Sequence, residues 1–142
     1  MGVRLSCLAS VAWLALIAAH SAFAANFTVM VGQNGSAQSA FAFNPSALTI
    51  HTGDSVTFTN FCPGGSCGFH NVDSTGGPTP FKCSVNCAST NTPNSTAWSD
   101  VVTFPTQGTI TYQCDQHFSF GMTGTINVLS SVPVRLQSFE VN

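Results

Sequence analysis

The sequence predicts an all-β protein, built as a sandwich or a barrel of short strands. Three observations support this fold class: apolar and polar residues alternate in short runs, these runs are rich in Val, Ile, Thr, Phe and Tyr, and Gly, Pro, Asn and Ser separate them. No amphipathic helix pattern follows the first 24 residues. Many short strands with turn signals between them are typical of sandwiches and barrels.

The first 24 residues have the organisation of an export signal. Arg4 precedes an apolar stretch at residues 5–19, and an Ala-Phe-Ala cleavage motif ends at Ala24. The apolar stretch is too short for a membrane anchor, and no later run approaches the roughly 20 apolar residues that a membrane-spanning helix needs. We therefore expect an exported protein, periplasmic or extracellular, with one mature domain over residues 25–142.

Six segments of the mature chain have the alternation of strands. In residues 26–32, for example, Phe27, Val29 and Val31 share one face. The six segments are residues 26–32, 47–50, 55–60, 101–104, 109–113 and 123–129. Seven phenylalanines supply much of the expected core: Phe41, Phe43, Phe58, Phe61, Phe69, Phe81 and Phe104.

Residues 73–99 interrupt this rhythm. They contain three prolines and the cysteines Cys83 and Cys87, and they show no strand period. A loop of this length is uncommon in a compact domain unless it is functional or braced, so we expect a disulfide-braced insertion. The tail at residues 130–142 either adds an edge strand or frays, and the sequence leaves both open.

The cysteine count indicates two disulfides. Of the six cysteines, Cys7 leaves with the signal and Cys114 belongs to the motif described below. The four others are Cys62, Cys67, Cys83 and Cys87. In an oxidising compartment they form two bridges with three possible pairings, which the sequence does not separate. A second metal site on these cysteines is the alternative, but no metal-ligand His stands beside them.

The mature chain carries few charges. It has two cations, Lys82 and Arg135, against five acidic side chains, a formal charge of −3. Two separated cations cannot displace the counterions of phosphates, which argues against a nucleic-acid partner. The polar surface is instead supplied by Ser, Thr, Asn, Gln and Gly. Such a neutral surface suits an exported protein and argues against strong electrostatic steering of a partner.

The residues that carry chemistry stand mainly near the C-terminal end. In YQCDQHFSFGM, residues 112–122, Cys114, His117 and Met122 have a C-x2-H-x4-M spacing directly after a predicted strand, and His70 supplies a second imidazole upstream. A thiolate, two imidazoles and a weak axial thioether suit copper electron-transfer sites. Each residue alone has an ordinary interpretation, as a buried thiol, a surface imidazole or a core methionine, but their spacing favours ligation.

The chain resembles the cupredoxins, the small blue copper proteins, and most of all their plastocyanin-like branch. The segments that carry the resemblance are FNP at 43–45, LTI at 48–50, GDSV at 53–56, TN at 59–60, HNV at 70–72, FPTQG at 104–108, YQC at 112–114, His117 and GMTG at 121–124. The resemblance implies a Greek-key β-sandwich of about seven to eight strands. It also implies one type 1 copper ion, cycling between Cu(I) and Cu(II), at one end.

The resemblance further assigns a role to each site residue. His70 and His117 would be the imidazole ligands, Cys114 the thiolate and Met122 the axial thioether. Asn71 would tie the two ligand loops together by hydrogen bonds around the thiolate sulfur. A turn asparagine is the ordinary alternative at that position.

These assignments predict an electron carrier and not an enzyme. We expect a monomer without a membrane anchor that meets redox partner proteins transiently, with Phe118 and Phe120 flanking an apolar docking surface around the ring of His117. The alternative for both phenylalanines is the core. A copper storage or delivery protein with the same ligands is the alternative function, whereas a redox enzyme would need further copper ligands and the chain has no His-x-His pair.

Three features depart from the plastocyanin pattern. Gln116 stands before His117 where plastocyanins usually have Pro, the insertion at residues 73–99 is additional, and the acidic docking clusters of some plastocyanins are missing. The first predicts a less rigid ligand loop. The last argues against a photosynthetic partner.

Overall fold

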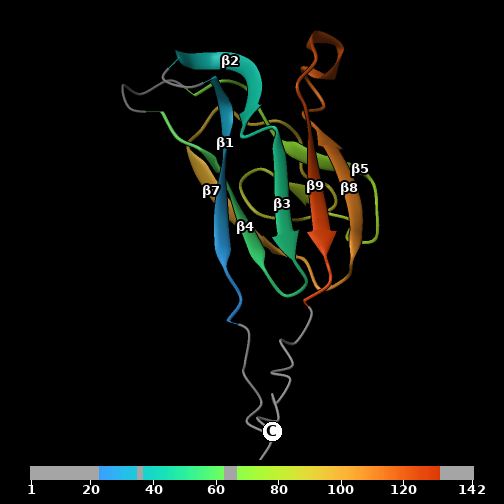
Figure 1. The fold of residues 1–142 in the computed structure, drawn as a ribbon. Helices are drawn as coiled ribbons and strands as arrows, with labels where there is room; N and C mark the ends of the chain where they lie inside the picture. The colour runs from blue at the N-terminus through green and yellow to red at the C-terminus, as the bar shows by residue number, and fades with distance from the viewer. Residues whose placement is uncertain (1–22, 35–36, 63–66, 132–142) are drawn as a thin grey trace, which may run out of the picture.

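The computed structural model describes residues 23–34, 37–62 and 67–131, which form two β-sheets packed as a sandwich (Figure 1). Within these residues the elements are β1 (Asn26–Asn34), β2 (Ala37–Asn44), β3 (Ala47–His51), β4 (Ser55–Asn60), β5 (Val72–Gly76), β6 (Lys82–Cys83), β7 (Trp98–Thr103), β8 (Gly108–Gln113), the 3-10 helix η1 (Phe118–Phe120) and β9 (Thr123–Leu129). The predicted all-β sandwich is confirmed.

The chain crosses repeatedly between the two sheets. One sheet has the order β2-β1-β4-β7 and the other the order β3-β9-β8-β5-β6. β1 runs parallel to β4, and β3 runs parallel to β9, while the other neighbours are antiparallel. Consecutive strands that lie in different sheets are typical of a Greek-key sandwich.

The alternation seen in the sequence corresponds to burial in the structure. In β4, Val56 and Phe58 are fully buried, while the threonines between and after them are only partly covered. Phe58 packs edge-on against Tyr112 of β8, with ring centroids 5.4 Å apart, so the two sheets meet through aromatic contacts. Burying each such side chain contributes about 1.5–3 kcal/mol, which explains why the strands with one apolar face form the centre of the sandwich.

Three strands were not predicted from the sequence: β2, β5 and β6. β2 pairs with β1 across an irregularity between Val31 and Gln33. β5 and β6 form an antiparallel pair that begins the segment expected to lack strands, and β5 also pairs with β8. β7 likewise starts at Trp98, before the predicted boundary at residue 101. Part of the expected loop is therefore the edge of the second sheet.

Two predicted segments lie largely outside the described residues. They are the export signal, of which only Phe23 and Ala24 are described, and the tail beyond Ser131. Over the described ranges, none of the helices has the length and apolar character required to cross a bilayer.

Candidate metal centre

Three metal-binding side chains converge at one end of the sandwich. Cys114 follows β8, His117 directly precedes η1, and His70 lies shortly before β5. The Sγ atom of Cys114 is 3.8 Å from Nδ1 of His70 and 3.6 Å from Nδ1 of His117, and the two Nδ1 atoms are 3.1 Å apart. A point at the centre of this triangle is about 2 Å from each atom, the distance at which nitrogen and sulfur ligands hold a transition-metal ion.

Met122 is fixed to the same loop through its backbone. Its N–H donates to the carbonyl oxygen of His117 at 3.2 Å, and its carbonyl oxygen accepts the N–H of Cys114 at 3.1 Å. The side chain is fully buried. Gly121, with φ 84°, ends η1 in the left-handed conformation that favours glycine, so a tight turn directly precedes Met122.

Burial controls the protonation of the two imidazoles. His70 is 1% exposed, and its burial, followed by the nearby His117, lowers the pKa of His70 to about 4. Burial also lowers the pKa of His117. Both rings are therefore neutral at neutral pH, the state in which histidine binds a metal ion. Two neutral nitrogens that face each other across 3.1 Å suit a cation between them.

Two glycines enclose the ring of His70. A Cβ atom placed on Gly32 or Gly68 would overlap the imidazole at Nε2 and Cδ2. Nε2 is buried and has no hydrogen-bond partner among the described residues, so the contact on this side of the ring is steric. The glycines therefore leave Nδ1 as the nitrogen that faces Cys114. Sequence reasoning missed both glycines, because nothing in their spacing relates them to His70.

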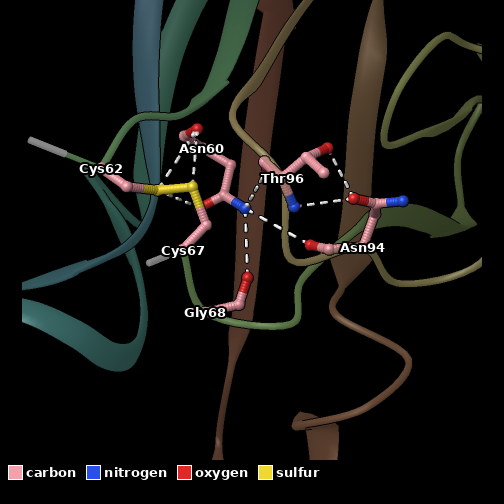
Figure 2. Close-up of a disulfide and its surroundings, with 6 residues drawn as sticks. All are labelled: Asn60, Cys62, Cys67, Gly68, Asn94 and Thr96. Carbon is pink, nitrogen blue, oxygen red and sulfur yellow. Dashed lines mark hydrogen bonds between the residues drawn. A yellow bond between two sulfur atoms is a disulfide. The ribbon is translucent and has the colours of Figure 1, made fainter. Parts of the chain in front are cut away.

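The loop before His70 is braced by a disulfide and a buried asparagine (Figure 2). Cys62 is bonded to Cys67. Figure 2 shows Asn60, at the end of β4, donating through Nδ2 to the carbonyl oxygen of Gly68 at 3.2 Å and to that of Thr96 at 3.3 Å. The side chain of Asn60 thus connects the loop of His70 to the end of the insertion.

The insertion also contacts His70 directly. The backbone N–H of His70 donates to the carbonyl oxygen of Asn94 at 3.1 Å, and the N–H of Asn94 donates to that of His70 at 2.9 Å. These two bonds form an isolated β-bridge. The insertion therefore holds the backbone of a candidate ligand.

The four remaining mature-chain cysteines form two disulfides, each between near neighbours in the sequence. The second bridge is Cys83–Cys87, inside the insertion. Asp100 lies close to this pair, but both sulfurs are already bonded to each other, so the alternative of a second metal site on the cysteines is not supported. Among the described cysteines, Cys114 is the free one, and it is buried.

Asn71 joins the two ligand loops. Its Oδ1 accepts the backbone N–H of Asp115 at 2.8 Å, and its Nδ2 donates to Oδ2 of Asp115 at 2.9 Å. We expected hydrogen bonds from Asn71 to connect the two ligand loops. They do so through Asp115, the residue that directly follows Cys114. Asp115 also meets Lys82, whose Nζ lies 2.8 Å from its carboxylate. Sequence reasoning missed both members of this ion pair.

Aromatic rings surround the exposed side of His117. Phe118 and Phe120 are 55% and 68% exposed, so neither is a core residue. Phe41 of β2 stacks on the imidazole of His117, with ring centroids 4.3 Å apart and planes 21° apart, and Phe120 lies next to Phe41 at 5.2 Å. Phe41 was expected in the core but is exposed, as Phe61 and Phe69 are, so the core prediction was wrong for these three rings. Phe41 is a further site residue that the sequence did not reveal, because β2 was not predicted.

A β-sandwich that brings two imidazoles and a thiol together at one end, with a methionine on the same loop, defines a cupredoxin, and this donor set fits copper. The sequence model of the copper-binding proteins of the plastocyanin/azurin family matches residues 30–129. The chain therefore belongs to the plastocyanin/azurin family of copper-binding proteins, and its cofactor is copper.

Two solved structures, a pseudoazurin and a copper-containing nitrite reductase, show the same fold. A pseudoazurin from Hyphomicrobium denitrificans is 19% identical over 72% of this chain and 74% of that chain, with a TM-score of 0.53. A copper-containing nitrite reductase from Thermus scotoductus is 22% identical over 82% of this chain but 25% of that chain, with a TM-score of 0.53. A mutant plastocyanin of a fern is 25% identical over 72% and 99% of the two chains, with a TM-score of 0.49. A search of curated proteins found no match.

Proposed function

We propose that this protein is an exported one-electron carrier with a single type 1 copper ion. The observation that carries the proposal is the triangle formed by Sγ of Cys114 and Nδ1 of His70 and His117. His70, His117 and Cys114 would hold the ion, and Met122 would supply the weak axial contact. When bound, copper supplies the exchange of one electron between Cu(I) and Cu(II).

The surroundings of the triangle support a carrier over a storage or delivery protein. His70, Cys114 and Met122 are all buried, and a disulfide and paired backbone bonds brace the loop of His70. A rigid, largely dry site changes little between two oxidation states, which favours electron transfer, whereas a protein that delivers copper must release it. The storage or delivery alternative uses the same ligands and differs in the rate of release.

Export and the partner surface are part of the same proposal. We infer a mature domain of residues 25–142 in a periplasm or outside the cell, where the two disulfides are stable. Its partners would be redox proteins that bind transiently to a monomer, at the exposed rings of Phe118 and Phe120 beside His117. Enzymatic activity is not part of the proposal, because the nitrite reductase likeness covers only a quarter of that enzyme.

The test is the visible and EPR spectrum of the purified mature protein after addition of Cu(II). We expect an intense blue charge-transfer band with narrow copper hyperfine splitting, lost in Cys114→Ser and kept in His51→Asn, a matched change of an exposed histidine in β3. A pale, ordinary copper spectrum would overturn the type 1 assignment. Loss of copper to a mild chelator during repeated redox cycles would favour storage or delivery.

A further inference from the structure

Lys82 connects the insertion to the loop that carries Cys114. Its Nζ lies 2.8 Å from Oδ2 of Asp73 and 2.8 Å from Oδ2 of Asp115, which is adjacent to Cys114 in the chain. It is the only lysine of the sequence. The chain therefore places its one lysine ammonium group between two carboxylates, one of which belongs to the ligand loop.

The position of Lys82 is fixed by the insertion. Lys82 and Cys83 form β6, in register with Asp73 and Val72 of β5. Cys83 is fully buried and bonded to Cys87, so the residue next to Lys82 is anchored in the core. A lysine on an unbraced loop would lose both backbone and side-chain conformational freedom on pairing. Here the backbone is already held, so only the side-chain freedom is lost when the ion pair forms.

Asp115 transmits this contact to both ligand loops. Its carboxylate accepts one hydrogen bond from Asn71 and the contact from Lys82, while its backbone N–H donates to Asn71. Asn71 follows His70, and Asp115 follows Cys114. The path from Lys82 through Asp115 therefore ends at residues adjacent to two of the copper-ligand candidates.

We propose that Lys82 is a positioning residue of the copper centre, which acts through Asp115 to hold the Cys114 loop and to offset the negative charge of Asp73 and Asp115. This proposal rests on the proposed function, because it takes Cys114 as a copper ligand. It also gives the insertion a role: it delivers a positive charge to the ligand loop in a chain that has few others.

Replacing Lys82 tests both parts of this role. Lys82→Met removes the cation and leaves two carboxylates near the site, and negative charge favours Cu(II) over Cu(I), so we expect a lower reduction potential. We also expect a shifted charge-transfer band, because the loop relaxes around the thiolate. Lys82→Arg keeps the charge and can pair with both carboxylates, so it should restore the potential and the band.

A matched control separates local positioning from net charge. Thr103→Glu changes the net charge by the same amount at an exposed position of β7, which pairs with Ser55 at the opposite end of β4 from Asn60. An equal fall in potential for Lys82→Met and Thr103→Glu would overturn the proposal, as would a lower melting temperature with an unchanged potential and band. If Lys82→Met does not fold, Lys82→Gln gives the same comparison with a polar side chain.

A measurement on the copper-free protein keeps this proposal distinct from the proposed function. Hydrogen exchange of the backbone amide of Asp115, which donates to Asn71, should be several-fold faster in Lys82→Met than in the wild type and unchanged in Thr103→Glu. Equal exchange in all three proteins would overturn the tie through Asp115. Absence of a blue band in the wild type would instead overturn the proposed function.

Discussion

The imidazole of His70 makes the copper-free protein sensitive to acid. Its pKa is lowered to about 4 in the folded chain, first by burial and then by His117, whereas an unfolded histidine has a pKa of about 6.5. Below pH 6.5 the unfolded chain therefore binds a proton that the folded chain does not, so stability falls as pH falls towards 4. The loss is on the order of 2 kcal/mol at pH 5.

Chemical denaturation of the copper-free protein at pH 7.5 and pH 5 measures this loss. His70→Gln removes the titrating group and should show a smaller decrease between the two pH values than the wild type. An equal decrease in both proteins would assign the acid sensitivity to other groups and contradict the prediction.

Gly68 is the residue at which a single methyl group should disturb the copper centre most directly. A Cβ there would overlap the ring of His70, while the backbone φ of Gly68 is not in the positive range that favours glycine. Gly68→Ala should therefore act by displacing the imidazole, at a cost of about 1–3 kcal/mol in the free energy of unfolding. It should also weaken copper binding, measured by competition with a chelator.

Gly76→Ala is the matched control for this change. A Cβ at Gly76 would meet only the hydroxyl oxygen of Thr111, at 3.2 Å, far milder than the overlap at Gly68. We expect its copper affinity to equal that of the wild type. A Gly68→Ala protein with wild-type affinity would show that the ring has room to move.

At the residue level, the sequence revealed metal-ligand residues that lie close together in the chain. It did not reveal contacts between residues that are distant in the chain and meet only in the folded protein. Cys114, His117 and Met122 lie within one short loop, so their spacing alone indicated a shared site. The pair of Lys82 and Asp115 joins residues far apart in the chain, and any acidic residue could have been the partner. Such a contact follows from the register of β6 on β5 and of β5 on β8, which the sequence did not predict.

Among the strands, alternation predicted those with one buried face. β4 and β9 each have three buried positions on one face, and their predicted ranges match the observed bounds. β5 and β6 are short and largely polar. Main-chain ladders hold β5 on β8 and β6 on β5, in place of a continuous apolar face. Periodicity cannot detect a strand of this kind, because backbone hydrogen bonds carry no sequence pattern.

The helix η1 contains a residue, Phe118, whose substitution should affect docking of a partner without affecting copper binding. Phe118 is 55% exposed, and its ring takes no part in the stack of Phe41, His117 and Phe120. Phe118→Glu should therefore slow electron exchange with a partner, because a charge at the centre of an apolar contact must lose its hydration. The copper spectrum should be unchanged.

Stopped-flow exchange with a redox partner protein, alongside the visible spectrum, measures this effect. Val101→Glu is a suitable control, since Val101 is an exposed apolar residue of β7 that should lie outside the contact. Equal exchange rates for Phe118→Glu and the wild type would remove Phe118 from the docking surface.

At the scale of the whole molecule, the candidate metal centre and the start of the mature chain lie at opposite ends of the sandwich. The loops that hold the candidate ligands gather near η1, while the start of β1 lies at the far end (Figure 1). There the backbone N–H of Ala25 donates to Oδ1 of Asp54 at 2.7 Å, and Asp54 also accepts the N–H of His51 at 2.8 Å. Asp54 is buried, and its carboxylate lies next to the nitrogen of Ala25, the first residue after the proposed cleavage site.

Cleavage after Ala24 would turn the amide nitrogen of Ala25 into an ammonium group beside Asp54. The hydrogen bond would then become an ion pair, which is stronger because both partners are charged. We expect the protein with a free Ala25 amine to be more stable than the same protein acetylated at that amine, by about 0.5–2 kcal/mol. Asp54→Asn should remove most of this difference, because a neutral amide can accept a hydrogen bond from the ammonium group but cannot form an ion pair with it. Thermal unfolding of the four proteins at neutral pH measures the coupling, and an equal stability difference in Asp54→Asn would place the partner of the mature N-terminus elsewhere.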